Sequence, residues 1–191
     1  MNKNSLFRFA GWSAYLSAAA TLVGAVTLVI FFSVGDPYGK MNDVSSVLIG
    51  LTGIVILFAL YQIHRASAPT VSLLAFVIGA IAMLIGAMLQ ALLVMTGTAY
   101  GEIVTFVFGI YGASLVIFGW LAASSGILPR ALAWMGIAAG LGYVLVTTVF
   151  VVGGPNHMLT YIGGALSVIA YPIWGFWLGR IWLRASVGDV L

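Results

Sequence analysis

The stretch SSGILPRALAWMGIAAG (residues 124–140) joins two long apolar runs through a short break that holds one proline and one arginine. Pro129 is a turn former, and Arg130 belongs to a chain in which only 6% of the residues are charged. Soluble domains carry about 25% charged residues. Because 63% of the residues are hydrophobic, the charges are too few to cover a water-facing surface, and the surface must face lipid.

The composition also excludes several functional classes. The net charge is +3, but lysine and arginine number only seven and are scattered along the chain. Such a distribution does not form the basic patch that follows a phosphate backbone, so we expect no nucleic-acid partner. The absence of cysteine excludes disulfides, thiol catalysis and cysteine-ligated metals.

Six apolar runs reach the length of about 20 residues that a helix needs to cross a bilayer. They occupy approximately residues 9–33, 44–63, 70–96, 103–124, 131–152 and 158–182. The breaks between them are too short to be domains, and the runs are too long and too uniformly apolar for the strands of a membrane barrel. The sequence therefore predicts one all-α domain over residues 1–191, an integral membrane bundle of six transmembrane helices. The first run is longer than the apolar region of a signal peptide, which spans roughly 7–15 residues, so we interpret it as an uncleaved helix.

The basic residues predict the orientation of this bundle. With a cytoplasmic amino terminus, six crossings leave Lys40 alone on the outer side. The other six basic residues then lie inside: Lys3, Arg8, Arg65, Arg130, Arg180 and Arg184. This asymmetry follows the positive-inside rule, so both termini are predicted to be cytoplasmic and Arg130 to mark a cytoplasmic turn.

Small residues at helical spacing predict where helices approach one another closely. Gly136–Gly140 and Gly175–Gly179 are both G-x-x-x-G patterns, and Ala14–Ala18 is a looser version. Such faces let helix backbones pack without lipid between them. We favour packing within the bundle, with a homo-oligomer or another helix-packing partner as the alternative.

Polar residues at membrane depth are the natural functional candidates, and this chain has few of them. Gln90 lies two-thirds along the third run. Its amide either forms a hydrogen bond to another helix or contacts a ligand. At the outer side, four residues predict a polar rim: Tyr100, Glu102, Asn156 and His157. Glu102 also suits the first turn of a helix, where a carboxylate complements the helix dipole.

The two histidines do not form a shared site. The predicted topology places His64 inside and His157 outside, about 30 Å apart across the bilayer core. We therefore expect no metal or haem between them and interpret both as interfacial residues. The chain also lacks the phosphate-loop, nucleophile-elbow and H-E-x-x-H motifs, so no catalytic residue is assigned.

The last run contains the segment YPIWGFWLGRIWLR (171–184). Pro172 removes a helical hydrogen bond and is expected to kink the helix. One interpretation is an aromatic pocket for an apolar or cationic ligand, formed by Tyr171, Trp174 and Trp177. The other is a kinked helix that tryptophans anchor at the membrane interface.

Residues 118–145 resemble a bacterial family of small polytopic membrane proteins of unknown function, whose members carry a Ser-Gly-x-x-Pro-Arg hairpin followed by a tryptophan and a glycine-rich helix. The matching positions are Ser125, Gly126, Pro129, Arg130, Trp134, Gly136 and Gly140. The resemblance implies a multi-pass protein of the bacterial inner membrane. It implies no activity and no cofactor.

Three functions follow as expectations. The poverty of ionisable groups favours a non-catalytic membrane protein, either an accessory subunit or a binder of an apolar small molecule. The alternative is a substrate-binding transport component similar in size and helix count to the membrane S-components of vitamin transporters, with Ala14–Ala18 similar to their docking face. An intramembrane enzyme is the third. The cofactor stays open, and the lipid bilayer is the one partner that all three share.

Overall fold

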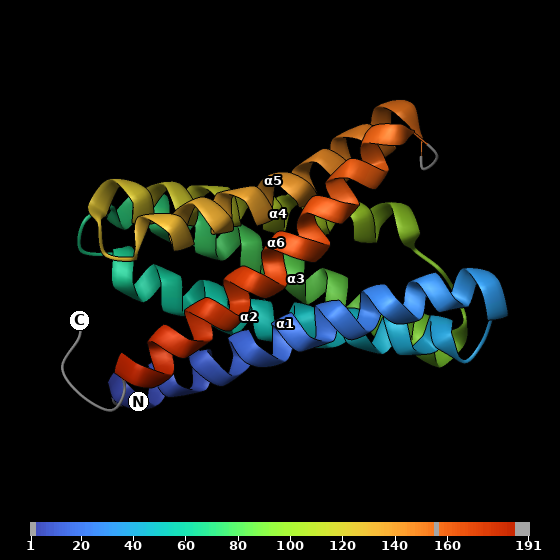
Figure 1. Ribbon diagram of the computed structural model, residues 1–191, viewed down its shortest axis with the longest axis horizontal. Helices are drawn as coiled ribbons and strands as arrows, with labels where there is room; N and C mark the ends of the chain where they lie inside the picture. Colours follow the sequence, from blue (N-terminus) through green and yellow to red (C-terminus); the bar gives the residue numbers. More distant parts are fainter. Residues whose placement is uncertain (1–2, 155–156, 186–191) are drawn as a thin grey trace.

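The computed structural model describes residues 3–154 and 157–185, and every regular element within them is a helix (Figure 1). Each helix contains one of the six predicted runs, and each is long and apolar enough to cross a membrane. The predicted all-α class with six transmembrane helices is therefore confirmed. The helices are α1 (Lys3–Val34), α2 (Tyr38–His64), α3 (Pro69–Thr96), α4 (Gly101–Ser125), α5 (Arg130–Gly153) and α6 (Met158–Ala185).

Two helices begin earlier than the hydropathy predicts. α1 begins at Lys3 rather than at residue 9, and α2 begins at Tyr38 rather than at residue 44. Hydropathy marks only the part of a helix that lies in hydrocarbon, whereas backbone hydrogen bonding continues through polar flanking residues. The break between α1 and α2 is correspondingly shorter than expected.

The helix ends use the predicted turn residues. α3 begins at Pro69, which needs no hydrogen-bond acceptor in a first turn. α4 ends at Ser125, and the next residue, Gly126, has a φ of 68° in the left-handed region and donates its N–H to the carbonyl of Ala122. A side chain at this position is strained, so glycine is the residue that stops α4 and begins the turn towards Arg130.

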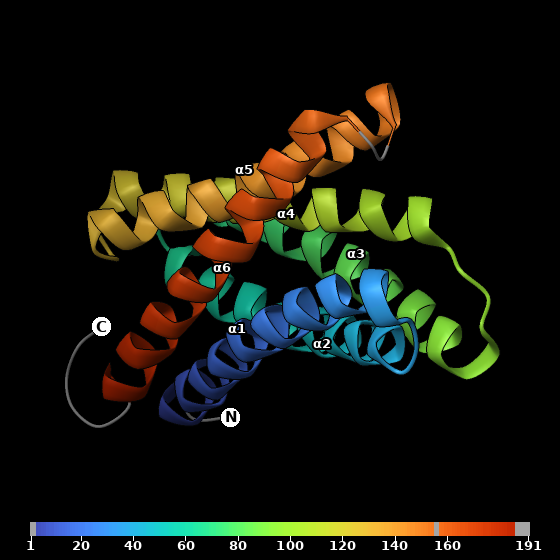
Figure 2. The same ribbon diagram turned by 45° about the vertical axis from the view of Figure 1, so that its right-hand side comes forward.

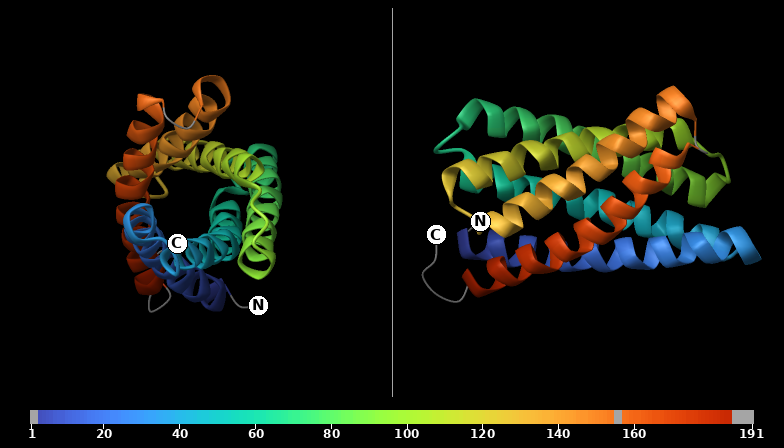
Figure 3. Two further views of the ribbon diagram at one scale, coloured as in Figure 1. Left: turned by 90° about the vertical axis from the view of Figure 1, so that its right-hand side faces the viewer. Right: turned by 45° about the horizontal axis from the view of Figure 1, so that its top comes forward.

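The six helices form a closed ring. Each packs against its neighbours in the chain, α6 returns to pack against α1, and only a small contact between α2 and α4 crosses the interior. The end-on view shows the helices arranged around a common axis (Figure 3, left). We call the end where α1 begins and α6 ends the terminal end, and the opposite end the distal end; Figure 2 shows both.

Close backbone contacts hold the ring together. A Cβ atom at Gly112 would lie 2.6 Å from the carbonyl oxygen of Gly140, which joins α4 to α5. A Cβ at Gly179 would lie 2.8 Å from the carbonyl oxygen of Gly11, which closes α6 onto α1. The small-residue patterns of α5 and α6 are thus used within the bundle, as the sequence favoured.

The outside of the ring is apolar on all six helices. Large hydrophobic side chains lie exposed along each of them, for example Phe32, Leu51, Ile78, Phe106, Val152 and Ile169. Exposed apolar surface on this scale is unfavourable in water and is suited to acyl chains. The chain is a multi-pass membrane protein.

Candidate functional site

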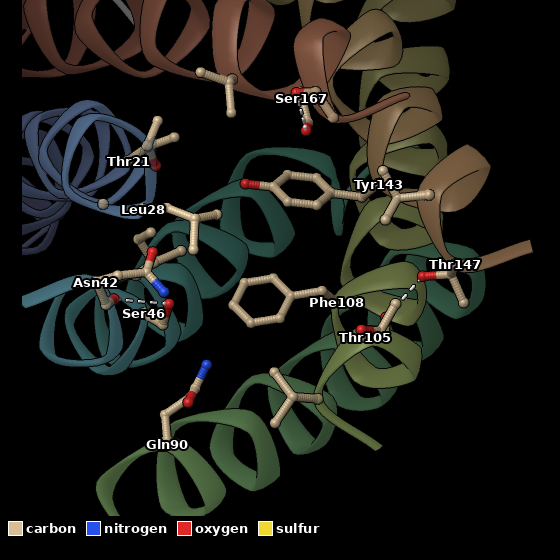
Figure 4. Close-up of a pocket in the computed structure, with 17 residues that line it drawn as sticks. Thr21, Leu28, Asn42, Ser46, Gln90, Thr105, Phe108, Tyr143, Thr147 and Ser167 are labelled. Atoms are coloured by element: carbon tan, nitrogen blue, oxygen red, sulfur yellow. Dashed lines mark hydrogen bonds between the residues drawn. The ribbon is translucent and has the colours of Figure 1, made fainter. Parts of the chain in front are cut away.

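A cavity of about 290 Å³ lies inside the distal half of the ring, and all six helices contribute to its wall (Figure 4). It is close in size to the smallest pockets that hold drug-sized ligands, about 300 Å³. A molecule in this cavity would contact every helix of the bundle.

The wall of the cavity carries no charged side chain and combines uncharged polar groups with a larger apolar surface. None of its 17 lining residues is acidic or basic. Two side-chain amides line it, Asn42 and Gln90. Hydroxyl groups line the rest of its polar surface, from Thr21, Ser46, Thr105, Tyr143, Thr147 and Ser167. Polar groups gathered at membrane depth, where lipid offers no hydrogen bonds, are the usual mark of a functional site.

A second hollow of about 350 Å³ adjoins the cavity at the distal end. Leu28 and Asn42 line both spaces, so they stand at the junction between them. The second hollow carries the charged groups that the cavity lacks, namely Asp36, Lys40 and Asp43. We call it the vestibule, because it lies between the cavity and the distal surface.

A cluster of hydroxyls forms the floor of the cavity. The Tyr171 hydroxyl lies 2.7 Å from the Ser17 oxygen and 2.9 Å from the Tyr111 hydroxyl, and all three residues are fully buried. The Tyr143 ring, which lines the cavity, lies 5.8 Å from the Tyr171 ring and 6.0 Å from that of Tyr111. The cluster ties α1, α4 and α6 together directly beneath the cavity.

Below this floor, large apolar side chains fill the ring. Leu60, Leu115, Phe118, Leu178 and Trp182 are all buried in one continuous core. This packing lies between the cavity and the terminal end, where Leu128, Arg130 and Trp182 line a separate hollow of about 560 Å³.

Among the residues proposed from sequence, Gln90 lines the cavity, where it is 8% exposed. Tyr171 belongs to the floor rather than to the wall. Trp174 is buried between α5 and α6 against Gly136, where a Cβ would lie 2.7 Å from the indole nitrogen. Trp177 is 37% exposed on the outside. Tyr171, Trp174 and Trp177 therefore do not line one shared pocket.

The predicted outer rim is not assembled either. Tyr100, Glu102 and His157 are exposed at the distal end, and none of them lines the cavity or the vestibule. The backbones of α4 and α6 do not approach each other closely, and the side-chain contact between them, Tyr111 to Tyr171, involves neither Glu102 nor His157. Asn156 lies outside the described residues. Asp36, in the α1–α2 turn, and Asp43, in α2, line the vestibule beside the cavity instead.

His64 also differs from its expected interfacial position. Its side chain is fully buried at the end of α2, 6.0 Å from the Phe118 ring. Neither ring nitrogen has a hydrogen-bond partner among residues 3–154 and 157–185. The same part of the chain contains no group of histidine and acidic side chains that would hold a metal ion.

Sequence reasoning missed most of the wall. Seven polar residues that line it were not proposed: Thr21, Asn42, Ser46, Thr105, Tyr143, Thr147 and Ser167. Their common signal is an uncharged polar residue within or beside an apolar run. No protein-family model, curated protein or solved structure matches the chain. The geometry of the cavity therefore carries the functional argument.

Proposed function

We propose that this protein is a non-catalytic membrane protein that binds a small, uncharged molecule in the distal cavity. The observation that carries this proposal is a cavity lined by all six helices, in which uncharged polar groups lie among apolar ones. The sequence pointed to an apolar ligand, and the hydroxyls and amides of the wall extend that expectation to a ligand with hydrogen-bonding groups as well as apolar surface.

The side chains in the wall support a binding role rather than a catalytic one. General acid–base catalysis needs a side chain that exchanges a proton near the working pH, and no such group lines the cavity. A ligand held here meets hydroxyls, amides, an aromatic pair and aliphatic side chains. These groups position a molecule but do not transform it.

The orientation belongs to the same proposal. Arg8, Arg65, Arg130, Arg180 and Arg184 are all exposed at the terminal end of the ring. By the positive-inside rule this end is cytoplasmic, which gives cytoplasmic termini and a cavity that opens to the outer side of the membrane. The resemblance of residues 118–145 supports a bacterial inner membrane as the location.

The alternative of a transport component was based on Ala14 and Ala18 as an exposed docking face, and these two residues are not exposed. Ala14 and Ala18 are fully buried, and a Cβ on Gly175 of α6 would lie 3.1 Å from that of Ala18. A face that α6 already covers does not dock a partner. The cavity suits a transport component equally well, but no exposed small-residue face on α1 supports that function.

Filling the cavity tests the proposal. Gly164 lines the cavity, and a side chain added there meets open space. Gly164→Phe is therefore expected to occupy the cavity without disturbing the helices. Gly101→Phe is the matched control, because Gly101 also has open space around it but does not line the cavity.

The measurement is mass spectrometry of small molecules extracted from the purified proteins in nanodiscs. We expect a molecule that accompanies the wild type and Gly101→Phe and is lost from Gly164→Phe. Identical extracts from all three proteins would contradict a ligand site in this cavity.

A further inference from the structure

The hydroxyl of every serine and threonine in the wall already donates a hydrogen bond within the protein. Each of the five donates a hydrogen bond to a backbone carbonyl: Thr21 to Ser17 (2.9 Å), Ser46 to Asn42 (3.1 Å), Thr105 to Gly101 (2.8 Å), Thr147 to Thr105 (2.7 Å) and Ser167 to Gly164 (2.9 Å). A hydroxyl has one proton but two lone pairs, so these oxygens can still accept hydrogen bonds. Thr21 is also hydrogen-bonded with the Tyr143 hydroxyl, so the hydroxyls of α2 and α4–α6 are the ones that offer acceptors to a ligand.

The kink residue of α6 adds a backbone acceptor. Pro172 has no N–H, so the carbonyl of Val168, four residues earlier, lacks its helical donor. Val168 is one of the residues that line the cavity. The proline therefore leaves a backbone carbonyl without its helical donor at a residue that lines the cavity.

Gln90 supplies a different kind of contact. Its side chain is more than nine-tenths buried, its amide points into the cavity, and it has no hydrogen-bond partner among the described residues (Figure 4). The other amide of the wall, on Asn42, is engaged with the Asp43 carboxylate. The amide faces the cavity with both its oxygen and its N–H groups free, and a ligand with one donor beside one acceptor satisfies both ends.

Two aromatic rings add a flat surface. Phe108 and Tyr143 both line the cavity and stack with ring centroids 5.8 Å apart and planes 25° apart. Aromatic faces favour planar ligands. They also attract cations, but the nearest acidic groups, Asp36 and Asp43, lie in the vestibule rather than in the wall. A cation in the cavity would be desolvated without a counter-charge, which favours a neutral ligand.

From these contacts we infer that the ligand is a neutral, planar ring compound whose edge carries an N–H beside a C=O. The Gln90 amide pairs with that edge, and further N–H or O–H groups donate to the hydroxyl oxygens of the wall. This inference rests on the proposed function, since it names the chemical class that the same cavity takes.

Four one-ring probes test this class: 2-pyridone has the N–H and C=O edge, 1-methyl-2-pyridone lacks its N–H, 1-methylpyridinium is a cation and benzene has no hydrogen-bonding group. Binding is measured by saturation-transfer NMR in nanodiscs, with empty nanodiscs as the background. We expect 2-pyridone to bind about tenfold more tightly than its methylated form, because methylation leaves the buried acceptors without a donor.

Gln90→Leu is expected to bring the two pyridones within about twofold of each other while benzene binding persists. Gln62→Leu is the matched control, because it makes the same change on α2 at a position that does not line the cavity. The comparison of the two pyridones on the wild type needs no variant, so it holds even if Gln90→Leu does not fold.

Equal binding of the two pyridones to the wild type, or tighter binding of 1-methylpyridinium, overturns the inferred ligand class. If Gly164→Phe abolishes binding in either case, the proposed function still stands. Absence of binding by all four probes also overturns the ligand class. The proposed function is then tested separately, by the mass spectrometry of molecules extracted from the wild type and Gly164→Phe.

Discussion

Removing the Tyr171 hydroxyl tests how the cavity floor holds the ring. Tyr171→Phe deletes one oxygen atom and keeps the ring, which lies 6.1 Å from that of Tyr111. That oxygen makes two hydrogen bonds, at 2.7 Å to Ser17 and 2.9 Å to Tyr111. The first of them spans 154 residues of sequence and joins the last helix to the first.

The expected cost follows from the two bonds. Side-chain hydrogen bonds between membrane helices average about 0.6 kcal/mol and reach about 1.7 kcal/mol, so losing two costs about 1–3 kcal/mol. Ser17 is able to turn its hydroxyl to a backbone carbonyl of its own helix, as Thr21 does. Tyr111 has no second partner for its hydroxyl within the described chain, so most of the cost is expected from this pair.

Reversible unfolding in mixed detergent micelles measures the free energy, and a double-mutant cycle isolates the pair. We expect a coupling of about 1 kcal/mol between Tyr171→Phe and Tyr111→Phe. Tyr61→Phe is the matched control, since that ring stacks on Phe76 at 5.6 Å and no hydrogen bond of its hydroxyl is found in the described residues. The argument is refuted if the coupling is zero within error, or if Tyr61→Phe costs as much as Tyr171→Phe.

Three further predictions follow from the ring. Gly112→Leu forces a side chain against the Gly140 carbonyl and should lower the unfolding free energy by about 1–3 kcal/mol or more, measured in the same assay, whereas Gly164→Ala should leave it nearly unchanged. Gly136→Leu should displace the Trp174 indole, which a change in near-ultraviolet circular dichroism would report and an unchanged spectrum would contradict. Because the chain has no cysteine, single cysteines in the α3–α4 and α4–α5 turns are free of background, and impermeant maleimide should label the first from outside and the second only from the cytoplasm.

The sequence was sufficient to predict the helices but not how they close into a ring. Length and hydropathy locate a transmembrane helix because the bilayer imposes both, and each predicted run lies within an observed helix. A G-x-x-x-G pattern indicates that some helix comes close without indicating which one. Gly175 and Gly179 could have met any neighbour, and their contact with α1 depends on the rotation of both helices.

The candidate site was predicted only at Gln90. A buried amide stands out in an apolar run, whereas serine and threonine do not, because they satisfy their own proton within the helix, as Thr21 and Ser167 do. Their grouping appears only when the ring brings the same depth of six helices together. The described rim residues Tyr100, Glu102 and His157 do not line the cavity for a related reason: lying at one end of a bundle does not place a residue on the inner face of its helix.

The position of the cavity follows from the sizes of the side chains that face the axis. In the distal half, small residues face the axis of the ring and leave space there; they include Gly24, Ala25, Ser46, Gly164 and Ser167. At other positions glycines let the same helices approach one another closely. In the terminal half the core side chains are large, including Leu60, Leu115, Phe118, Leu178 and Trp182, and they fill the same ring. Since packed interiors leave few voids, the cavity reflects small side chains at one level of the ring and large ones at another. The hydroxyl cluster of Ser17, Tyr111 and Tyr171 lies between these levels, so we expect a ligand in the cavity to affect the contacts among α1, α4 and α6 first.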